Sequence, residues 1–232
     1  MNHIKKIIPS YAIIPLICVL SVNFIAYGLS KLIVSDATHY SLLLPIDKKF
    51  PFVPEFVIIY IAAFAQWIIG FLLIAQEGKE FCHRFFSAEI TAKLICFIFF
   101  LFFPTMISRP EITDTDLCSR LCAMIYAVDT PVNCFPSVHC LESWVCLRSA
   151  FELTKTARRG KGYKYAYIIY SALMTLSVFA SVVLIKQHFF LDIIGGIAVF
   201  EIGMFICRRT GSYRIFRLRG SKTQQSPERT RQ

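Results

Sequence analysis

Charged residues are scarce in this chain. Only 17% of its 232 residues are Asp, Glu, Lys or Arg, whereas 56% are hydrophobic. A soluble domain of this length is rarely so apolar, so the composition argues against an ordinary water-soluble fold. The chain also lacks an internal repeat and a Gly/Ser-rich linker, which argues against a repeat protein and against two separable domains. We therefore predict one membrane-embedded domain over residues 1–207, followed by a basic, disordered, cytoplasmic tail over residues 208–232.

Long apolar runs take the place of the missing charges. A helix needs roughly 20 mostly apolar residues to cross a bilayer, and six runs qualify as candidates: 11–34, 55–75, 88–107, 137–153, 165–185 and 189–207. The fourth run is the weakest, because Glu142 and Arg148 interrupt it. The first run has no small-residue cleavage pattern, so we expect it to be retained. The fold class predicted is all-α, a six-transmembrane helical bundle.

The net charge of +10 is distributed unevenly along the chain. In a soluble protein it would suggest a nucleic-acid partner, but here the basic residues occupy alternate loops. Basic loops stay cytoplasmic, so we predict cytoplasmic N- and C-termini, no nucleic-acid partner, and a tail that lies against anionic lipid. The basic side comprises Lys5, Lys6, Lys79, Arg84, Lys155, Arg158, Arg159, Lys161, Lys164 and the cations from Arg208 onward.

Four of the nine cysteines cluster on the predicted outer side: Cys118, Cys122, Cys134 and Cys140. Cys118 and Cys122 are one helical turn apart, which is a poor geometry for a disulfide between them. A disulfide to Cys134 and free thiols are both compatible with the spacing, and sequence does not decide the pairing. Residues 115–128 around the first two cysteines have apolar residues at helical spacing, which predicts a short helix in the membrane interface.

Three polar segments carry the candidate chemistry. The first, "FPTMISRP", ends in Arg109 after the third apolar run. The second, "PSVH", places Ser137 and His139 at the start of the fourth run. The third, "KQHFFLD", places His188 and Asp192 at the start of the sixth run. In a six-span topology these segments meet at the extracytoplasmic ends of helices three, four and six, so we expect them to form one site.

The residue types in these segments favour binding of an anion. His188 and Asp192 are four residues apart, so they share a helix face, and the carboxylate can fix the tautomer of the imidazole. Arg109 and Lys186 add positive charge, and a helix N-terminus beside His139 favours anions. Such a set suits phosphoryl transfer, which depends mainly on positioning and charge stabilisation. A metal is a poorer explanation, because two imidazoles and one carboxylate are accompanied by cations.

The three segments resemble the motifs of the type 2 phosphatidic acid phosphatase superfamily, which also includes vanadium haloperoxidases. The family pattern is K-x6-R-P, then P-S-G-H, then S-R-x5-H-x3-D. Here the segments read "FFPTMISRP", "PSVH" and "SVVLIKQHFFLD", and the resemblance spans roughly residues 45–200. Among the branches of the family, the chain is most similar to bacterial-type membrane lipid phosphatases.

Three family positions differ in this chain. The first Lys of the pattern falls at Phe102, the Gly of the second motif is Val138, and the Arg of the third motif is Val182. On a continuous helix Lys186 would share the face of Val182, so we expect it to replace the missing Arg. Lys93 falls nearer the other end of the third helix and offers no evident substitute for the missing Lys.

The resemblance implies a role for each remaining motif residue. His188 would attack phosphorus and form a phosphohistidine, Asp192 would orient it, and His139 would protonate the leaving oxygen and then activate water. The phosphate oxygens would be held by Arg109, Ser137 and Lys186. The resemblance to the family's membrane lipid phosphatases implies that the reaction needs no metal and no other cofactor. Glu142, three residues after His139, is a possible further site residue, because intramembrane charges are functional candidates.

The predicted function is hydrolysis of a membrane lipid phosphomonoester or an isoprenyl diphosphate. Two alternatives stay open. One is a lipid headgroup phosphotransferase of the sphingolipid-synthase type, which uses a similar His/His/Asp set. The other is an inactive six-helix protein that binds lipid. The compact chain favours a bacterial inner membrane with the site on the extracytoplasmic side. The lipid and the oligomeric state are not indicated by the sequence.

Overall fold

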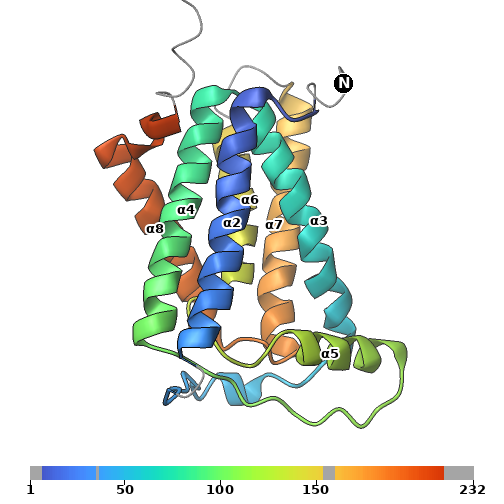
Figure 1. The fold of residues 1–232 in the computed structure, drawn as a ribbon. Helices are drawn as coiled ribbons and strands as arrows, with labels where there is room; N and C mark the ends of the chain where they lie inside the picture. The colour runs from blue at the N-terminus through green and yellow to red at the C-terminus, as the bar shows by residue number, and fades with distance from the viewer. Residues whose placement is uncertain (1–6, 35–36, 154–159, 217–232) are drawn as a thin grey trace, which may run out of the picture.

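The computed structural model describes residues 7–34, 37–153 and 160–216, and these residues form an all-helical fold without a β-strand (Figure 1). The all-α prediction is therefore confirmed. Seven α-helices are described: α2 (Ser10–Ile33), α3 (Val57–Gln76), α4 (Lys79–Phe102), α5 (Leu117–Val128), α6 (Val138–Leu153), α7 (Lys161–Leu184) and α8 (Phe190–Thr210). Three short 3-10 turns accompany them: η1 (Asp47–Lys49), η2 (Pro54–Phe56) and η3 (Ser212–Phe216).

Five helices are long and apolar enough to cross a membrane: α2, α3 together with η2, α4, α7 and α8. The predicted fourth span forms α6, but this helix has only 16 residues. It packs against α3, α7 and α8, and most of its side chains are buried. A helix enclosed by others needs no lipid-facing surface, which is how α6 accommodates two glutamates. The count of six spans is not confirmed.

The boundaries of α4 differ from the predicted run 88–107. The helix ends at Phe102 because Pro104 has no N–H and restricts the conformation of Phe103. It begins nine residues earlier than predicted, at Lys79. Its N-terminal half carries Arg84, which pairs with Glu152 of α6. A charged residue lowers the hydropathy of its segment, so the sequence pattern places the start of the helix too late. In the folded bundle, Glu152 neutralises this charge.

The short helix predicted within residues 115–128 is present as α5. It begins after Asp116, whose carboxylate accepts hydrogen bonds from the backbone N–H groups of Cys118 (2.9 Å) and Ser119 (3.2 Å), a typical N-cap. The helix lies across the end of the bundle (Figure 1). Leu117, Met124 and Val128 are exposed on it.

Some predictions fall on residues that the structure does not describe. These are the basic residues Lys5, Lys6, Lys155, Arg158 and Arg159, and the tail beyond residue 216. Of the predicted tail, the first residues are ordered into helix: α8 continues to Thr210, and η3 then packs against α4.

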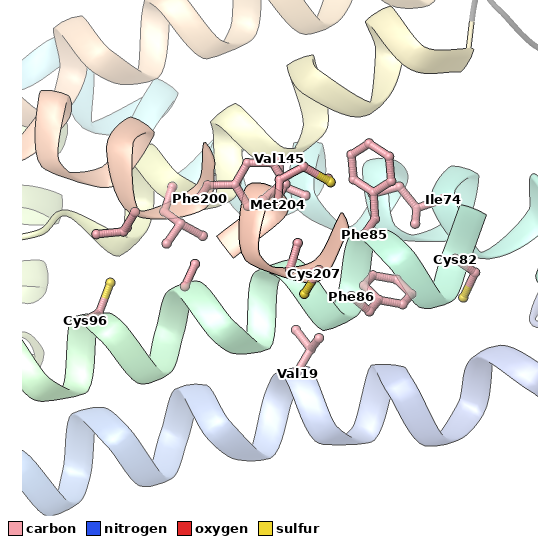
Figure 2. Close-up of a cluster of buried hydrophobic side chains, with 14 of the residues drawn as sticks. Val19, Ile74, Cys82, Phe85, Phe86, Cys96, Val145, Phe200, Met204 and Cys207 are labelled. Carbon is pink, nitrogen blue, oxygen red and sulfur yellow. The ribbon is translucent and has the colours of Figure 1, made fainter. Parts of the chain in front are cut away.

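The helices of the bundle pack around α4 and α6. α4 packs between α2 and α8, and α6 packs among α3, α7 and α8. Figure 2 shows the main apolar core, in which Phe85 and Phe86 of α4 lie near Phe200 and Met204 of α8. Many large apolar side chains of α2, α3, α7 and α8 are exposed instead, as expected where lipid rather than protein covers a helix.

A pair of glycines brings the start of α8 onto the start of α6. A Cβ atom at Gly196 would lie 2.5 Å from the backbone oxygen of Ser137 and 3.0 Å from the nitrogen of Leu141. A Cβ at Gly195 would collide with the ring of Phe135. The backbone N–H of Ser137 donates to the carbonyl oxygen of Asp192 at 3.1 Å. The two motif segments are thus locked together by backbone atoms.

An ionic network connects helices at the end of the bundle that is opposite the starts of α6 and α8. We call this end the basic end. Glu152 of α6 accepts from Arg84 of α4, Arg148 of α6 (2.9 Å) and Arg208 of α8. Arg148 also pairs with Glu201 of α8 at 3.2 Å. Arg148 therefore serves helix packing, on the side of α6 away from the motif residues.

Substitution of Gly196 by Ala is expected to destabilise the bundle. The new methyl group meets backbone atoms that move only with their helix, and overpacking of this kind costs about 1–3 kcal/mol. The measurement is thermal unfolding of the purified protein in detergent. Gly28→Ala in α2 is the matched control, because nothing lies within 4 Å of the added methyl group. Equal melting temperatures for the two variants would contradict the close approach of α8 to α6.

Candidate functional site

The three polar segments converge at the end of the bundle opposite the basic end, which we call the site end. Arg109 follows α4, His139 lies in the first turn of α6, and His188 and Asp192 flank the start of α8. The ring centroids of His139 and His188 are 6.2 Å apart. A nucleophile and a general acid each act over roughly 3 Å from a reacting atom. The two rings are therefore close enough for one bound group to contact both.

Asp192 orients His188. Its Oδ2 atom lies 3.2 Å from Nδ1 of His188 and accepts a hydrogen bond from the backbone N–H of Phe189 at 2.9 Å. Asp192 is fully buried and His188 is 9% exposed. A proton on Nδ1 is donated to this carboxylate, which leaves Nε2 of His188 with a free lone pair. In this tautomer Nε2 could act as a nucleophile.

His139 is held by aromatic rings. It stacks on Tyr60 with ring centroids 4.3 Å apart, and Trp67 lies 5.1 Å away. Both rings come from α3. The Nε2 atom of His139 is buried and has no hydrogen-bond partner among the described residues. The aromatic contacts fix the plane of the imidazole and leave one nitrogen available to a ligand.

Arg109 is positioned by hydrogen bonds and by an aromatic ring. Nη1 donates to the backbone oxygen of Asp129 at 2.6 Å, Nη2 donates to Oε1 of Gln187, and the guanidinium lies 4.5 Å from the ring centroid of Tyr126. No carboxylate side chain pairs with it in the described part of the chain. The guanidinium of Arg109 therefore makes no ion pair with the side chains that the structure describes.

Ser137 and Lys186 lie at the edge of this arrangement. Ser137 caps α6, because its Oγ accepts from the backbone N–H of Cys140 at 3.3 Å. The helical placement expected for Lys186 is not found: α7 ends at Leu184, Lys186 has a φ of 54°, and its Nζ donates to the carbonyl of Phe50 at 2.6 Å. Burial lowers the pKa of Lys186, and nearby Asp47 opposes that shift.

A cavity of about 720 Å³ opens beside the two histidines. Its lining comes from α2, α3, α4, α5 and α6 and from the turn before α8, and most of it is apolar. His139, His188, Arg109 and Gln187 lie on its wall. A second, smaller cavity of about 140 Å³ is also lined by His188, and Lys186 forms part of its wall. The larger cavity has the size and character of a lipid site.

Three residues on the cavity wall carry a buried nitrogen without a hydrogen-bond partner among the described residues: Nε2 of His139, Nε of Arg109 and Nε2 of Gln187. Unsatisfied buried groups are uncommon in folded proteins and call for an explanation. Arginine and amide N–H groups can only donate. The nitrogens of Arg109 and Gln187 therefore match acceptor oxygens of a ligand, whereas Nε2 of His139 donates or accepts according to its tautomer.

Sequence analysis missed several of these residues. Gln187 lies within the "KQH" stretch but received no role, and Tyr60, Trp67 and Asp129 lie in segments without a recognisable motif. Lys93 was placed too far away: it lies in the middle of α4 and lines the cavity, pairing with Glu142 at 2.6 Å. A basic residue inside an apolar run was the available signal for Lys93.

The described residues contain no group of three or more His, Cys, Asp or Glu side chains placed to hold a metal ion. All nine cysteines lie in the described part of the chain, and each is a free thiol. Of the two arrangements that the cysteine spacing left open, the structure shows the free thiols.

A family model described as the PAP2 superfamily matches residues 51–206. The chain therefore belongs to the PAP2 superfamily, that of the type 2 phosphatidic acid phosphatases. The matched region begins before α3 and ends within α8, so it includes every motif residue. No curated protein and no solved structure matches the chain.

Replacement of Tyr60 by Leu is expected to free the ring of His139. An aromatic pair contributes about 0.5–1.5 kcal/mol, so we expect the reaction of His139 with diethyl pyrocarbonate to accelerate roughly two- to tenfold. The rate is measured by mass spectrometry of the modified peptide. Tyr60→Phe, which keeps the stacked ring, should leave the rate unchanged, and equal acceleration in both variants would refute the stacking role.

Proposed function

We propose that the chain is an integral-membrane lipid phosphate phosphatase that works through a phosphohistidine at His188. Membership of the PAP2 superfamily supports phosphoryl transfer as the class of reaction. The observation that carries the proposal is the set of three unpartnered nitrogens around two imidazoles 6.2 Å apart. Arg109, Gln187 and both histidines line the same cavity, so a phosphate bound there could accept hydrogen bonds from Arg109 and Gln187 close to the two rings.

In the first step, Nε2 of His188 attacks phosphorus while the bond between phosphorus and the lipid oxygen breaks. Protonated His139 gives its proton to that oxygen, so the lipid leaves as an alcohol. The imidazole of His188 becomes positively charged, and the buried carboxylate of Asp192 stabilises this charge. Arg109 and Gln187 donate to the phosphoryl oxygens, where negative charge accumulates.

In the second step, His139 is neutral and acts as a base. It takes a proton from a water molecule whose oxygen attacks phosphorus, and the bond between phosphorus and Nε2 of His188 breaks. Inorganic phosphate leaves, and both histidines return to their starting forms. Neither step requires a proton donor or acceptor beyond the residues already placed.

The shape of the cavity supports a lipid substrate. Its wall is mostly apolar, and residues of α2 and α3 such as Phe24 and Ile68 line it and are also exposed on the bundle surface. A long-chain lipid could therefore enter from the membrane with its phosphate directed to the histidines. The exposed apolar side chains of α5 at the site end would sit in the headgroup layer.

Other residues would partly replace the two cations of the family pattern that this chain lacks. Phe102, at the position of the first Lys, is 81% exposed and is not among the residues that line the cavity. Gln187 supplies a neutral donor, and Lys186 adds charge from the small cavity that His188 also lines. Ser137 contributes by holding the start of α6, whose N-terminal dipole favours the phosphate.

We further propose that the site end faces the extracytoplasmic side of a bacterial inner membrane, with both termini in the cytoplasm. The support is the distribution of basic residues, since Arg84, Lys161, Lys164, Arg208 and Arg209 all belong to helix ends at the basic end. Basic segments flanking spanning helices remain cytoplasmic.

A second candidate function is transfer of the phosphoryl group, or of a phosphate-linked headgroup, to an alcohol. The aromatic enclosure of His139 by Tyr60, Trp67 and Phe64 favours it, because these rings restrict the approach of water. The covalent intermediate would be the same. Addition of an acceptor alcohol would then raise the rate and redirect the product from inorganic phosphate to a new ester.

We expect the purified protein to release phosphate from lipid phosphates in the presence of EDTA. His188→Ala should abolish release, because the nucleophile is lost, and His139→Ala should lower it at least about a hundredfold. Phosphate is quantified against a panel of phosphatidate, lysophosphatidate and isoprenyl diphosphate. His83→Ala is the matched control, because that buried histidine lies at the start of α4, away from the cavity lining. Absence of release from every lipid by folded protein, with and without an acceptor alcohol, would refute the enzymatic proposal and leave the lipid-binding alternative.

The two cations are expected to differ in their contribution to phosphate affinity. Arg109→Lys loses the fixed fork of donors, so competition by inorganic phosphate should weaken roughly tenfold. Lys186→Met should weaken it about threefold, because its ammonium is bound to the carbonyl of Phe50 and acts at longer range. The inhibition constant of phosphate measures both effects. A larger loss at Lys186 than at Arg109 would show that Lys186 leaves Phe50 and contacts the phosphate directly.

A further inference from the structure

An ionic cluster lies inside the bundle, deeper than the two histidines. Lys93 and Glu89 come from α4, and Glu142 comes from α6, three residues after His139. Lys93 is 2% exposed, Glu142 is 4% exposed and Glu89 is fully buried. α6 runs from the site end toward the basic end, so Glu142 lies about 4.5 Å deeper than His139 along the helix axis. Charges at this depth are expensive and are functional candidates.

The ammonium of Lys93 has no donor left for a ligand. Its Nζ lies 2.6 Å from Oε1 of Glu142, 2.9 Å from Oε1 of Glu89 and 3.4 Å from the carbonyl oxygen of Val19. These three contacts account for its three N–H groups. The cluster therefore presents acceptors, and no free donor, to its surroundings.

One acceptor of the cluster belongs to the cavity wall. Oε2 of Glu142 is buried and has no hydrogen-bond partner among the described residues, and Glu142 lines the large cavity together with Lys93. Oε2 of Glu89 is also without a partner, but Glu89 is not among the described residues that line the cavity. A cluster that only held α4 against α6 would have no need of an open carboxylate oxygen at a ligand cavity. Leaving such an acceptor unpaired is costly.

We infer that Glu142, anchored by Lys93, accepts a hydrogen bond from a hydroxyl or amide N–H of the lipid substrate next to its phosphate. The inference rests on the proposed function, since it requires the phosphate to lie between His139 and His188. An acceptor one helical turn deeper then faces the atoms that link the phosphate to the lipid chain. Lipids with a donor in this linkage are selected. Fully esterified glycerol lipids, which offer only acceptors there, and isoprenyl phosphates, which offer no polar group, are disfavoured.

The test compares two ligands that differ only in the donor: 1-oleoyl lysophosphatidate, and the same lipid with its free hydroxyl methylated. Binding is measured on purified His188→Ala protein in detergent, so that turnover plays no part. A hydrogen bond to a charged group predicts that the hydroxyl lipid binds about tenfold more tightly. Glu142→Gln, made in the same background, should bring this ratio close to one.

Glu89→Gln is the matched control. It changes the other carboxyl partner of the same ammonium but leaves the cavity wall intact, so it should preserve the tenfold ratio. If Glu142→Gln does not fold, Glu142→Asp replaces it, since Asp keeps the charge but withdraws the carboxylate by one methylene, and the ratio should fall. A ratio near one in the protein with Glu142 intact would overturn the inference, and so would equal changes in the Glu142 and Glu89 variants.

Failure of the inference and failure of the proposed function give different results. Phosphate release by the wild-type protein from any lipid of the panel supports the proposed function, whatever the binding ratio. Binding of both lipids with a ratio near one overturns only the role of Glu142. A tenfold ratio without any turnover by the wild-type protein would leave the selectivity in place and refute the phosphatase.

Discussion

The packing of the start of α8 on the start of α6 is the contact on which the rest of the site depends. Gly196 lets the two backbones approach, and the N–H of Ser137 donates to the carbonyl of Asp192. Because these are backbone contacts, they fix His139 relative to His188 without relying on flexible side chains. Asp192 then serves two purposes, since its carboxylate caps α8 and orients His188. Asp192 therefore contributes both to the structure at the start of α8 and to the proposed chemistry of His188.

Unsatisfied polar atoms on the cavity wall describe the expected ligand. Donor nitrogens of Arg109 and Gln187 lie beside the imidazoles, whereas an acceptor oxygen of Glu142 lies one helical turn deeper. An apolar cavity surrounds both groups, so neither would be left open without cost. Under the proposed function, the arrangement would suit an amphipathic molecule with an anionic end, followed by a donor and then a long apolar chain. A lipid phosphate lying across the membrane interface has this order of groups.

The sequence predicts best those features that depend on residues close together along the chain. The contact between His188 and Asp192 and the short helix within residues 115–128 follow from neighbours along the chain, and the structure contains both, although His188 precedes α8 and does not lie on it. Sequence failed where partners come from distant helices. The start of α4 was placed too late because Arg84 is neutralised by Glu152 of another helix, and Lys93 was dismissed because its link to Glu142 is tertiary. Lys186 departs from the expected helix because α7 ends at Leu184 and the chain turns toward Phe50.

The most direct test of the account is to trap the covalent intermediate. Wild-type protein is mixed with a lipid phosphate labelled with ³²P, quenched within milliseconds in alkali, and digested for mass spectrometry. The account predicts an alkali-stable, acid-labile phosphate on the peptide that carries His188, and none on the peptide that carries His139. Labelling of His139, or steady release of phosphate with no label on either histidine, would contradict His188 as the nucleophile.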